Sequence, residues 1–154
     1  MLRVRGRSVK KKFAIVLDID GVLLDNSETF KGILNLGLKG DEKWDYFYDN
    51  CNKAPLICET LNFLNCISKN VDIILSTARN EKCRALTEAR LKNDFVPFTY
   101  IYMRTNNDLR PSPEVKEEHL KAIMKKYSVI AFIDDDILNC EAAKKLGILA
   151  LRKV

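Results

Sequence analysis

The hydrophobic and polar positions of this chain alternate between short apolar runs and longer amphipathic segments. The short runs are rich in β-branched residues and end at or beside polar residues; they cover 13–17, 71–77, 100–103, 129–133 and 148–151. Runs of this kind are typical of strands that are buried on both faces of a parallel sheet. The alternation with amphipathic segments predicts an α/β fold, in which a parallel five-stranded sheet has helices on both faces and right-handed crossovers.

Proline and glycine positions mark the ends of the predicted helices. Pro55 suits the first turn of one helix, residues 80–92 follow the second strand as another, and residues 111–113 bracket the start of a third. Gly147 ends the last helix before the final strand. The single histidine, His119, is expected on a helix surface.

The segment after the first strand is too long for an ordinary connection between a strand and a helix. Its apolar residues recur at helical spacing, with a turn near Gly37 and Gly40. We expect a small helical insert at about 25–53, which forms a flap or minimal cap over the carboxyl end of the first strand. Its aromatic side chains fit two roles, stacking on a substrate base or packing the insert on the core; they are Phe30, Trp44, Phe47 and Tyr48.

Composition narrows the class of protein. With 154 residues, 47% hydrophobic and 31% charged, the chain is expected to form one soluble globular domain. No apolar run approaches the roughly 20 residues of a membrane-spanning helix, and the N-terminus lacks the apolar core of a secretory signal. The five cysteines are odd in number and contain no C-x-x-C pair, so we expect reduced thiols and a cytoplasmic location.

The net charge of +5 originates at the N-terminus. Six basic residues precede the first acid: Arg3, Arg5, Arg7, Lys10, Lys11 and Lys12. Without them the formal charge is 5 − 6 = −1. We therefore expect a basic arm at residues 1–12, followed by a single domain at 13–154. Residues 3–12 suit contact with nucleic acid or another polyanion, and equally a solvated tail; no membrane contact is expected.

Polar residues that could take part in catalysis or metal binding cluster at the carboxyl ends of the predicted strands and at one helix start. They are Asp18, Asp20, Thr77, Lys116, Asp134 and Asp135. Because the carboxyl ends of parallel strands lie at one edge of a sheet, these side chains should meet. Several carboxylates in one crevice require a divalent cation, and an all-oxygen ligand set suits Mg²⁺. A hydroxyl and a lysine beside them would bind a phosphate, and a lysine at a helix start needs an anionic partner.

In this order, the residues resemble the four motifs of the haloacid dehalogenase (HAD) superfamily of phosphotransferases. The motif D-x-D-G-[VT] matches residues 18–22, the strand-terminal hydroxyl matches Thr77, and the helix-start lysine matches Lys116. The acid pair after an apolar strand matches residues 134–135, and the resemblance covers residues 13–151. It implies a Rossmann-like HAD core with a minimal cap.

The resemblance further implies a magnesium-dependent phosphomonoester hydrolase. Asp18 would attack phosphorus to form an aspartyl-phosphate, and Asp20 would protonate the leaving oxygen and then activate water. Thr77 and Lys116 would bind the transferring phosphoryl group. The implied magnesium ligands are Asp18, Asp20 through its backbone carbonyl, Asp134 and, for the metal or its waters, Asp135.

A narrower resemblance is to the phosphatase domain of polynucleotide kinase/3′-phosphatase proteins, including phage versions. It is carried by residues 76–79, 102–104, 108, 110 and 115–116. It implies a nucleic-acid 3′-phosphate end or a nucleotide as substrate. Three arginines become candidates for contacts to the leaving group or a second phosphate, with surface salt bridges as the alternative: Arg79, Arg104 and Arg110. The chain departs from this group at Ser112, where an acid is common, and in residues 25–30, which contain no arginine.

Two other classes of protein share part of this pattern. A signalling receiver domain has its phosphorylated aspartate after the third strand, whereas here the second acid cluster follows the fourth, so the order does not fit. The alternative that stays open is a catalytically idle HAD scaffold that binds nucleic acid through its basic arm, although every catalytic position is filled.

Overall fold

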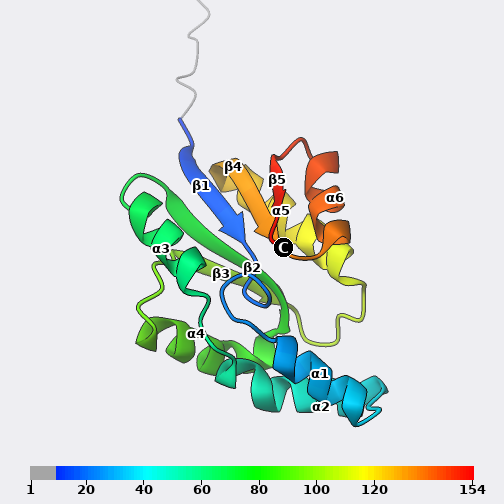
Figure 1. Cartoon of the computed structure of the whole chain (residues 1–154). Helices are drawn as coiled ribbons and strands as arrows, with labels where there is room; N and C mark the ends of the chain where they lie inside the picture. The colour runs from blue at the N-terminus through cyan, green and yellow to red at the C-terminus, as the bar shows by residue number, and fades with distance from the viewer. Residues whose placement is uncertain (1–9) are drawn as a thin grey trace, which may run out of the picture.

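The computed structural model describes residues 10–154, which contain the predicted five-stranded parallel sheet (Figure 1). Its strands are β1 (Lys12–Leu17), β2 (Asp72–Asn80), β3 (Tyr100–Arg104), β4 (Tyr127–Asp134) and β5 (Ala150–Arg152). They lie in the order β3-β2-β1-β4-β5, and every neighbouring pair is parallel. The first strand therefore lies at the centre of the sheet, where both of its faces are covered.

Helices cover both faces of the sheet, as the alternation of strands and helices predicts. They are α3 (Cys58–Ile67), α4 (Arg84–Asn93), α5 (Ser112–Lys126) and α6 (Ile137–Lys145). On one face, Leu64 of α3 and Leu91 of α4 pack with Leu17 and Leu75 in one apolar cluster. On the other face, α5 and α6 pack on the alternate residues of the strands; this second cluster includes Val16, Ile74, Leu120, Phe132 and Ala143.

The second strand is longer than the sequence predicts. It continues beyond Thr77 to Asn80, because a bulge extends its pairing with β3. Ser76 pairs with Tyr102 and Asn80 pairs with Arg104, so β2 advances by four residues where β3 advances by two. Such bulges redirect side chains at the ends of strands. This one contains Thr77 and Arg79, two of the predicted site residues.

The prediction that His119 lies on a helix surface is wrong. The residue is 7% exposed, on the side of α5 that packs against the sheet. Its ring nitrogens contact Ser76 of β2 and Met103 of β3. A histidine can replace an apolar residue at a buried helix position when both ring nitrogens find partners.

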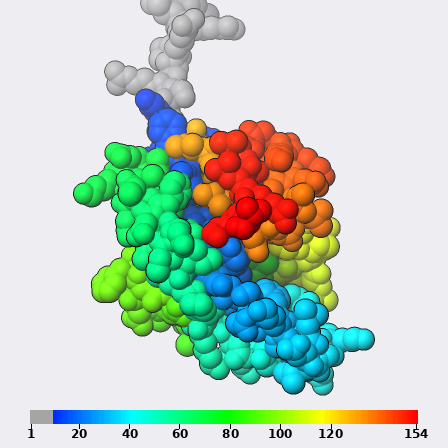
Figure 2. All heavy atoms as spheres, viewed as in Figure 1, coloured from blue at the N-terminus to red at the C-terminus, as the bar shows by residue number. Residues whose placement is uncertain are grey.

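Two helices and a 3-10 turn occupy the segment where the sequence predicts a helical insert. They are α1 (Ser27–Asn35), α2 (Gly40–Asn50) and η1 (Cys51–Lys53); a second 3-10 turn, η2 (Glu81–Cys83), precedes α4. Ile33, Phe47 and Cys51 form a small apolar core of the insert. Phe30 and Trp44 lie 5.5 and 6.1 Å from Phe47 between ring centroids, and both stay more than 40% exposed. Phe30, Trp44 and Phe47 therefore pack on one another, and Tyr48 also packs on the main apolar cluster under α3 and α4. The insert is the light blue to cyan region of Figure 2.

The predicted basic arm falls only partly within the described residues. Arg3, Arg5 and Arg7 lie outside them. Lys12 is the first residue of β1, and Lys11 Nζ donates to the backbone oxygen of Met124 at 2.5 Å. Across residues 10–154, each helix is too short or too polar to cross a lipid bilayer.

Candidate active site

The parallel pairing of β1 and β4 brings two acids together at the carboxyl edge of the sheet. Leu17 is the register partner of Ile133, so the residues that follow them, Asp18 and Asp134, are neighbours. The backbone N–H of Asp18 donates to the oxygen of Ile133 at 2.9 Å. Carboxylate oxygens of Asp18, Asp134 and Asp135 lie within 4.8 Å of one another. We call these three residues the carboxylate cluster.

Lys116 extends from α5 into this cluster and is completely buried. Its Nζ lies 2.8 Å from Asp18 Oδ1 and 3.1 Å from Asp134 Oδ2, and it donates to the backbone oxygen of Ser76. The ammonium is thus held by two ion pairs and by one hydrogen bond to the backbone. Burial acts to lower the pKa of Lys116, but Asp18 and Asp134 outweigh it and raise this pKa above its ordinary value. The prediction that Lys116 has an anionic partner is confirmed.

The carboxyl group of Asp18 needs positive charge nearby to ionise. Burial raises its pKa to about 8, against the lowering effect of Lys116, and Asp134 and Asp20 add to the rise. A divalent cation at the cluster would favour the ionised form, because opposite charge stabilises a carboxylate. The charge of Lys116 and that of a metal would therefore act in the same direction on Asp18.

The residues of the carboxylate cluster fit a magnesium ion. Asp134 Oδ1 accepts hydrogen bonds from the backbone N–H of Asp136 and from Asn139 Nδ2, both at 3.0 Å. Asp134 Oδ2 is buried and accepts no hydrogen bond from the described residues; its contact with Lys116 is an ion pair without hydrogen-bond geometry. Such an oxygen has a lone pair available for a hard cation.

Gly21 keeps space beside the cluster. Its φ is +77°, and a Cβ at this position would lie 2.2 Å from Asp135 Oδ2. Any larger residue would therefore displace the Asp135 carboxylate. The glycine of the first motif is required both by the turn and by the Asp135 carboxylate next to it.

The side chain of Asp20 lies outside the carboxylate cluster and is held by Arg79. Arg79 Nε donates to Asp20 Oδ2 at 2.9 Å, and Nη2 donates to Oδ1 at 2.6 Å. The other contacts of the guanidinium go to Asn52 Oδ1 (2.6 Å), Thr87 Oγ1 (3.1 Å) and the backbone oxygen of Cys51 (3.3 Å). Asn26 Nδ2 also donates to Asp20. Because Arg79 is 2% exposed and its five N–H donors have five acceptors, it orients Asp20 in this structure.

Thr77 lies in the bulge of β2, two residues before Arg79. It is 1% exposed, and its Oγ1 accepts the backbone N–H of Arg79 at 3.1 Å. The hydroxyl hydrogen is then free to point elsewhere, since a hydroxyl both donates and accepts. The bulge thus gives Thr77 and Arg79 their positions together.

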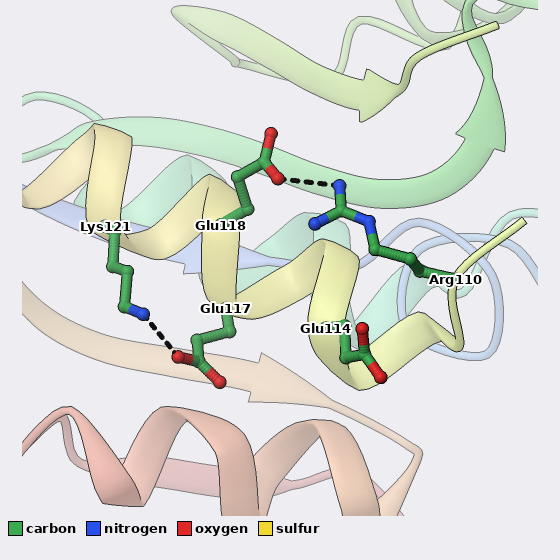
Figure 3. A pocket seen from close by; sticks show the side chains of 5 residues that line it. All are labelled: Arg110, Glu114, Glu117, Glu118 and Lys121. Atoms are coloured by element: carbon green, nitrogen blue, oxygen red, sulfur yellow. Dashed lines mark hydrogen bonds and ion pairs between the residues drawn. The ribbon is translucent and has the colours of Figure 1, made fainter. Parts of the chain in front are cut away.

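The structure does not bring Arg104 and Arg110 to the carboxylate cluster. Arg104 donates to the backbone oxygens of Ala78 (3.0 Å), Asp108 (3.1 Å) and Arg110 (2.5 Å), and so holds the loop before α5. Arg110 is ion-paired with Asp108 at 2.7 Å and Glu118 at 2.6 Å. Figure 3 shows Arg110 pointing toward Glu118. Both residues line a hollow of about 280 Å³ on α5, together with Glu114, Glu117 and Lys121. To reach a substrate, Arg110 would have to leave these acids.

Several residues that support the site carry no sequence signal. They are Asn26, Asn52, Thr87 and Asn139. Each contacts Asp20, Arg79 or Asp134 through a side-chain oxygen or amide group that comes close to them only after folding. A single sequence shows no periodicity or spacing that would distinguish such polar residues from ordinary loop and helix residues.

The fold is shared with solved phosphatase structures. A chain of the Pnkp1/Rnl/Hen1 RNA repair complex matches with a TM-score of 0.75 and 19% identity over 99% of this chain and 47% of that one. This chain therefore spans about half of that protein. The class C acid phosphatase from Bacillus anthracis matches with a TM-score of 0.69 and 23% identity, over 92% of this chain and 64% of that one.

A third solved structure contains magnesium. The HAD family enzyme bt-2542 from Bacteroides thetaiotaomicron, an Asp-to-Ala mutant in complex with magnesium and inorganic phosphate, has a TM-score of 0.55 and 17% identity. The match covers 96% of this chain and 95% of that one. At these identities, structural similarity shows the fold alone.

Comparison with protein families gives the assignment. A search of curated protein sequences finds no match. The family model of HAD superfamily, subfamily IIIB (acid phosphatase), matches residues 2–149, nearly the whole chain. As the four motifs predict, the chain belongs to the HAD superfamily, in its acid phosphatase subfamily IIIB.

Proposed function

We propose that this HAD phosphatase is a magnesium-dependent phosphomonoester hydrolase that acts through an aspartyl-phosphate on Asp18. One observation carries the proposal: the buried Lys116 ammonium lies 2.8 Å from Asp18 and 3.1 Å from Asp134. A nucleophile, a cation for the phosphoryl oxygens and a metal-binding carboxylate therefore meet at one point. The four HAD motifs support the same assignment of roles.

In the first step, an oxygen of Asp18 attacks phosphorus, and the bond from phosphorus to the leaving oxygen breaks. Lys116 and the hydroxyl of Thr77 bind the phosphoryl oxygens during this transfer. Asp20 gives a proton to the leaving oxygen, so that the alcohol product departs neutral. Arg79 keeps the Asp20 carboxyl directed for that proton transfer.

In the second step, Asp20 takes a proton from a water molecule. The water oxygen attacks phosphorus, and the bond between phosphorus and Asp18 breaks. This releases inorganic phosphate and restores both carboxyl groups to their starting states.

The residues that would hold Mg²⁺ are Asp18, Asp134, Asp135 and the backbone carbonyl of Asp20. When bound, the ion neutralises charge on the phosphoryl oxygens. The all-oxygen donor set of the cluster supports magnesium over softer metals. The magnesium in the bt-2542 structure also supports this proposal.

We propose nucleic-acid 3′-phosphate ends or nucleotides as the substrate. The support is the narrower motif resemblance, together with similarity to a chain of an RNA repair complex. The cap consists of two short helices, α1 and α2, and such a minimal cap suits the end of a polymer better than a large cap that encloses a small metabolite. We also propose a cytoplasmic location, which the five unpaired cysteines support.

The test is magnesium-dependent phosphate release by the wild type and by Asp18→Asn. The substrates are 3′-phosphorylated oligonucleotides, 5′-phosphorylated oligonucleotides, nucleoside monophosphates and an aryl phosphate. Asp18→Asn should lose turnover by about 10³-fold or more, because no nucleophile remains. Asp94→Asn is the matched control, since Asp94 is ion-paired with Arg90 at the end of α4 and should keep full activity.

The substrate panel separates the possible outcomes. Selective release from the 3′-phosphorylated oligonucleotide supports an end-processing phosphatase, and release from mononucleotides alone supports a nucleotidase. Substantial turnover by Asp18→Asn would overturn the nucleophile assignment. Silence of the wild type on the whole panel would overturn the proposed substrate class and favour the idle scaffold.

A truncation tests the proposed role of the basic arm. Removal of residues 1–9 leaves Lys11 in its contact with α5 and Lys12 in its place at the start of β1. If the arm binds nucleic acid, the KM for an oligonucleotide should rise in the truncated chain while that for an aryl phosphate stays unchanged. If truncation leaves the KM of each substrate unchanged, the arm has no part in substrate binding.

A further inference from the structure

His119 is buried and uses both ring nitrogens. Nδ1 lies 3.0 Å from Ser76 Oγ, and Nε2 lies 3.1 Å from the backbone oxygen of Met103. A backbone carbonyl only accepts hydrogen bonds, so Nε2 must carry the hydrogen. In a neutral imidazole Nδ1 is then an acceptor, and the Ser76 hydroxyl donates to it. The contacts therefore specify one tautomer of His119.

Ser76 is held by α5 at two of its atoms. Its hydroxyl binds His119, and its backbone oxygen accepts a hydrogen bond from Lys116 Nζ. His119 and Lys116 are three residues apart on α5 and so lie on the same side of the helix. Ser76 is also the last regularly paired residue before the bulge that contains Thr77. Any shift of Ser76 would therefore move an acceptor of Lys116 and the start of the bulge together.

The surroundings keep His119 neutral. Burial lowers its pKa to about 4, and Lys116 acts in the same direction. Two other charged groups have smaller effects on this pKa: Glu118, on α5, raises it, and Arg104, on β3, lowers it. The Tyr102 ring packs on the imidazole with 5.7 Å between centroids. Protonation would place a second cation beside Lys116 and remove the acceptor of the Ser76 hydroxyl.

We propose that His119 is a positioning residue of the active site, which holds Ser76 so that Lys116 and Thr77 keep their places around the phosphoryl group. The inference rests on the proposed phosphatase reaction, because Lys116 and Thr77 are assigned roles only in that reaction. His119 acts through Ser76 and does not touch the substrate. None of the four motifs that identify the family includes it.

Two substitutions separate this role from a purely structural one. In His119→Asn, Oδ1 can replace Nδ1 as the acceptor for Ser76, but the bond to Met103 is lost. In His119→Gln, the amide can replace Nε2 as the donor to Met103, but the bond to Ser76 is lost. Each variant loses one hydrogen bond, so thermal unfolding should show similar destabilisation. We expect kcat to fall about tenfold in His119→Gln and to stay within about threefold of wild type in His119→Asn, with little change in KM.

A variant at Ser76 tests the same link from the other side. Ser76→Ala should have about the same kcat as His119→Gln. The decrease in kcat of the double variant Ser76→Ala/His119→Gln should be no larger than that of either single variant. Ile123→Val, in the apolar cluster under α5, is a control that lowers stability while kcat stays unchanged. Equal kcat values for His119→Asn and His119→Gln, or additive losses in the double variant, would overturn the proposal.

A measurement without turnover tests the geometry itself. His119 is the single histidine of the chain, so in the untagged protein its imidazole gives one set of ¹H–¹⁵N signals. We expect the Nε2–H tautomer and a titration midpoint near 4. An Nδ1–H tautomer, or a midpoint near 6.5, would overturn the proposal. A wild type that shows this tautomer but releases no phosphate from any substrate would instead refute the proposed function, and with it the role of His119.

Discussion

Lys116 and Arg79 are two buried cations at the same edge of the sheet, and each contacts a carboxylate of the first motif. Lys116 presents one nitrogen to two carboxylates from different strand ends and to the backbone oxygen of Ser76. Arg79 presents a planar fork to a single carboxylate and occupies both of its oxygens. The two acids of one short motif are thus held in different ways.

The difference follows from the chemistry of the two side chains. An ammonium is a compact charge, so it neutralises Asp18 and Asp134 while leaving oxygens available. Lys116 and the backbone N–H of Ile19 both contact Asp18 Oδ1, and Oδ2 takes part in neither contact. A guanidinium sets the direction of a carboxylate by two parallel hydrogen bonds. In the proposed reaction, lysine therefore suits Asp18, which would react and bind the metal, and arginine suits Asp20, whose carboxyl group must keep a fixed direction.

Removal of the lysine charge should have the largest effect. In Lys116→Met, Asp18 and Asp134 are left without their cation, and turnover should fall about 10²- to 10³-fold. The free energy of unfolding should fall by about 3 kcal/mol, because buried carboxylates lose their partner. Phosphate release and urea unfolding measure the two effects. Lys121→Met, which removes a largely exposed lysine paired with Glu117 on the same helix, should change both only slightly.

Replacement of the arginine fork should have the next largest effect. Arg79→Lys keeps the positive charge but cannot hold both oxygens of Asp20, and it leaves Asn52 and Thr87 with unpaired groups. We expect kcat to fall about 10- to 100-fold, with a smaller change in KM, because Asp20 loses its direction. Arg84→Lys, in surface ion pairs with Glu81 and Glu88, is the control. An unchanged kcat in Arg79→Lys would show that a positive charge beside Asp20 is enough for turnover and that the two parallel hydrogen bonds are not needed.

A methyl group beside the carboxylate cluster should have a moderate effect on metal binding. The Cβ of Gly21→Ala would displace Asp135, so the Mg²⁺ concentration for half-maximal activity should rise about tenfold. Gly147→Ala provides a matched control: its φ is also +77°, but its Cβ would meet nothing within 4 Å. Both variants should lose about 1 kcal/mol of stability through backbone strain. An equal rise in the Mg²⁺ requirement of both variants would contradict the cluster assignment.

The exposed arginine should matter least. Arg110 is ion-paired with Asp108 and Glu118 on the outer side of α5, where such pairs contribute little. We expect Arg110→Ala to change KM for oligonucleotide substrates by less than about threefold. Glu118→Gln removes one of these ion pairs while keeping the arginine. A large rise in KM in Arg110→Ala, but not in Glu118→Gln, would restore Arg110 as a substrate contact.

Much of the fold could be predicted because it depends on short-range patterns. Apolar runs separated by amphipathic segments specify a parallel sheet, and a parallel sheet collects Asp18 and Asp134 at one edge. Their contacts with Lys116 follow from that edge and from the need of a buried lysine for anions. The length of β2 could not be predicted, because the bulge depends on how Arg104 and β3 hold its backbone.

Residue patterns along the chain were enough to predict the class of fold, the HAD assignment and the identity of the acids, the hydroxyl and the lysine. The contacts of the other polar residues became evident only from the folded arrangement. Arg79 points to Asp20, Arg110 to Asp108 and Glu118, and His119 to Ser76 inside the sheet. The physical reason is that a polar side chain is satisfied by the acceptors that folding places around it. Most of those acceptors come from segments distant in sequence, so no local pattern records them.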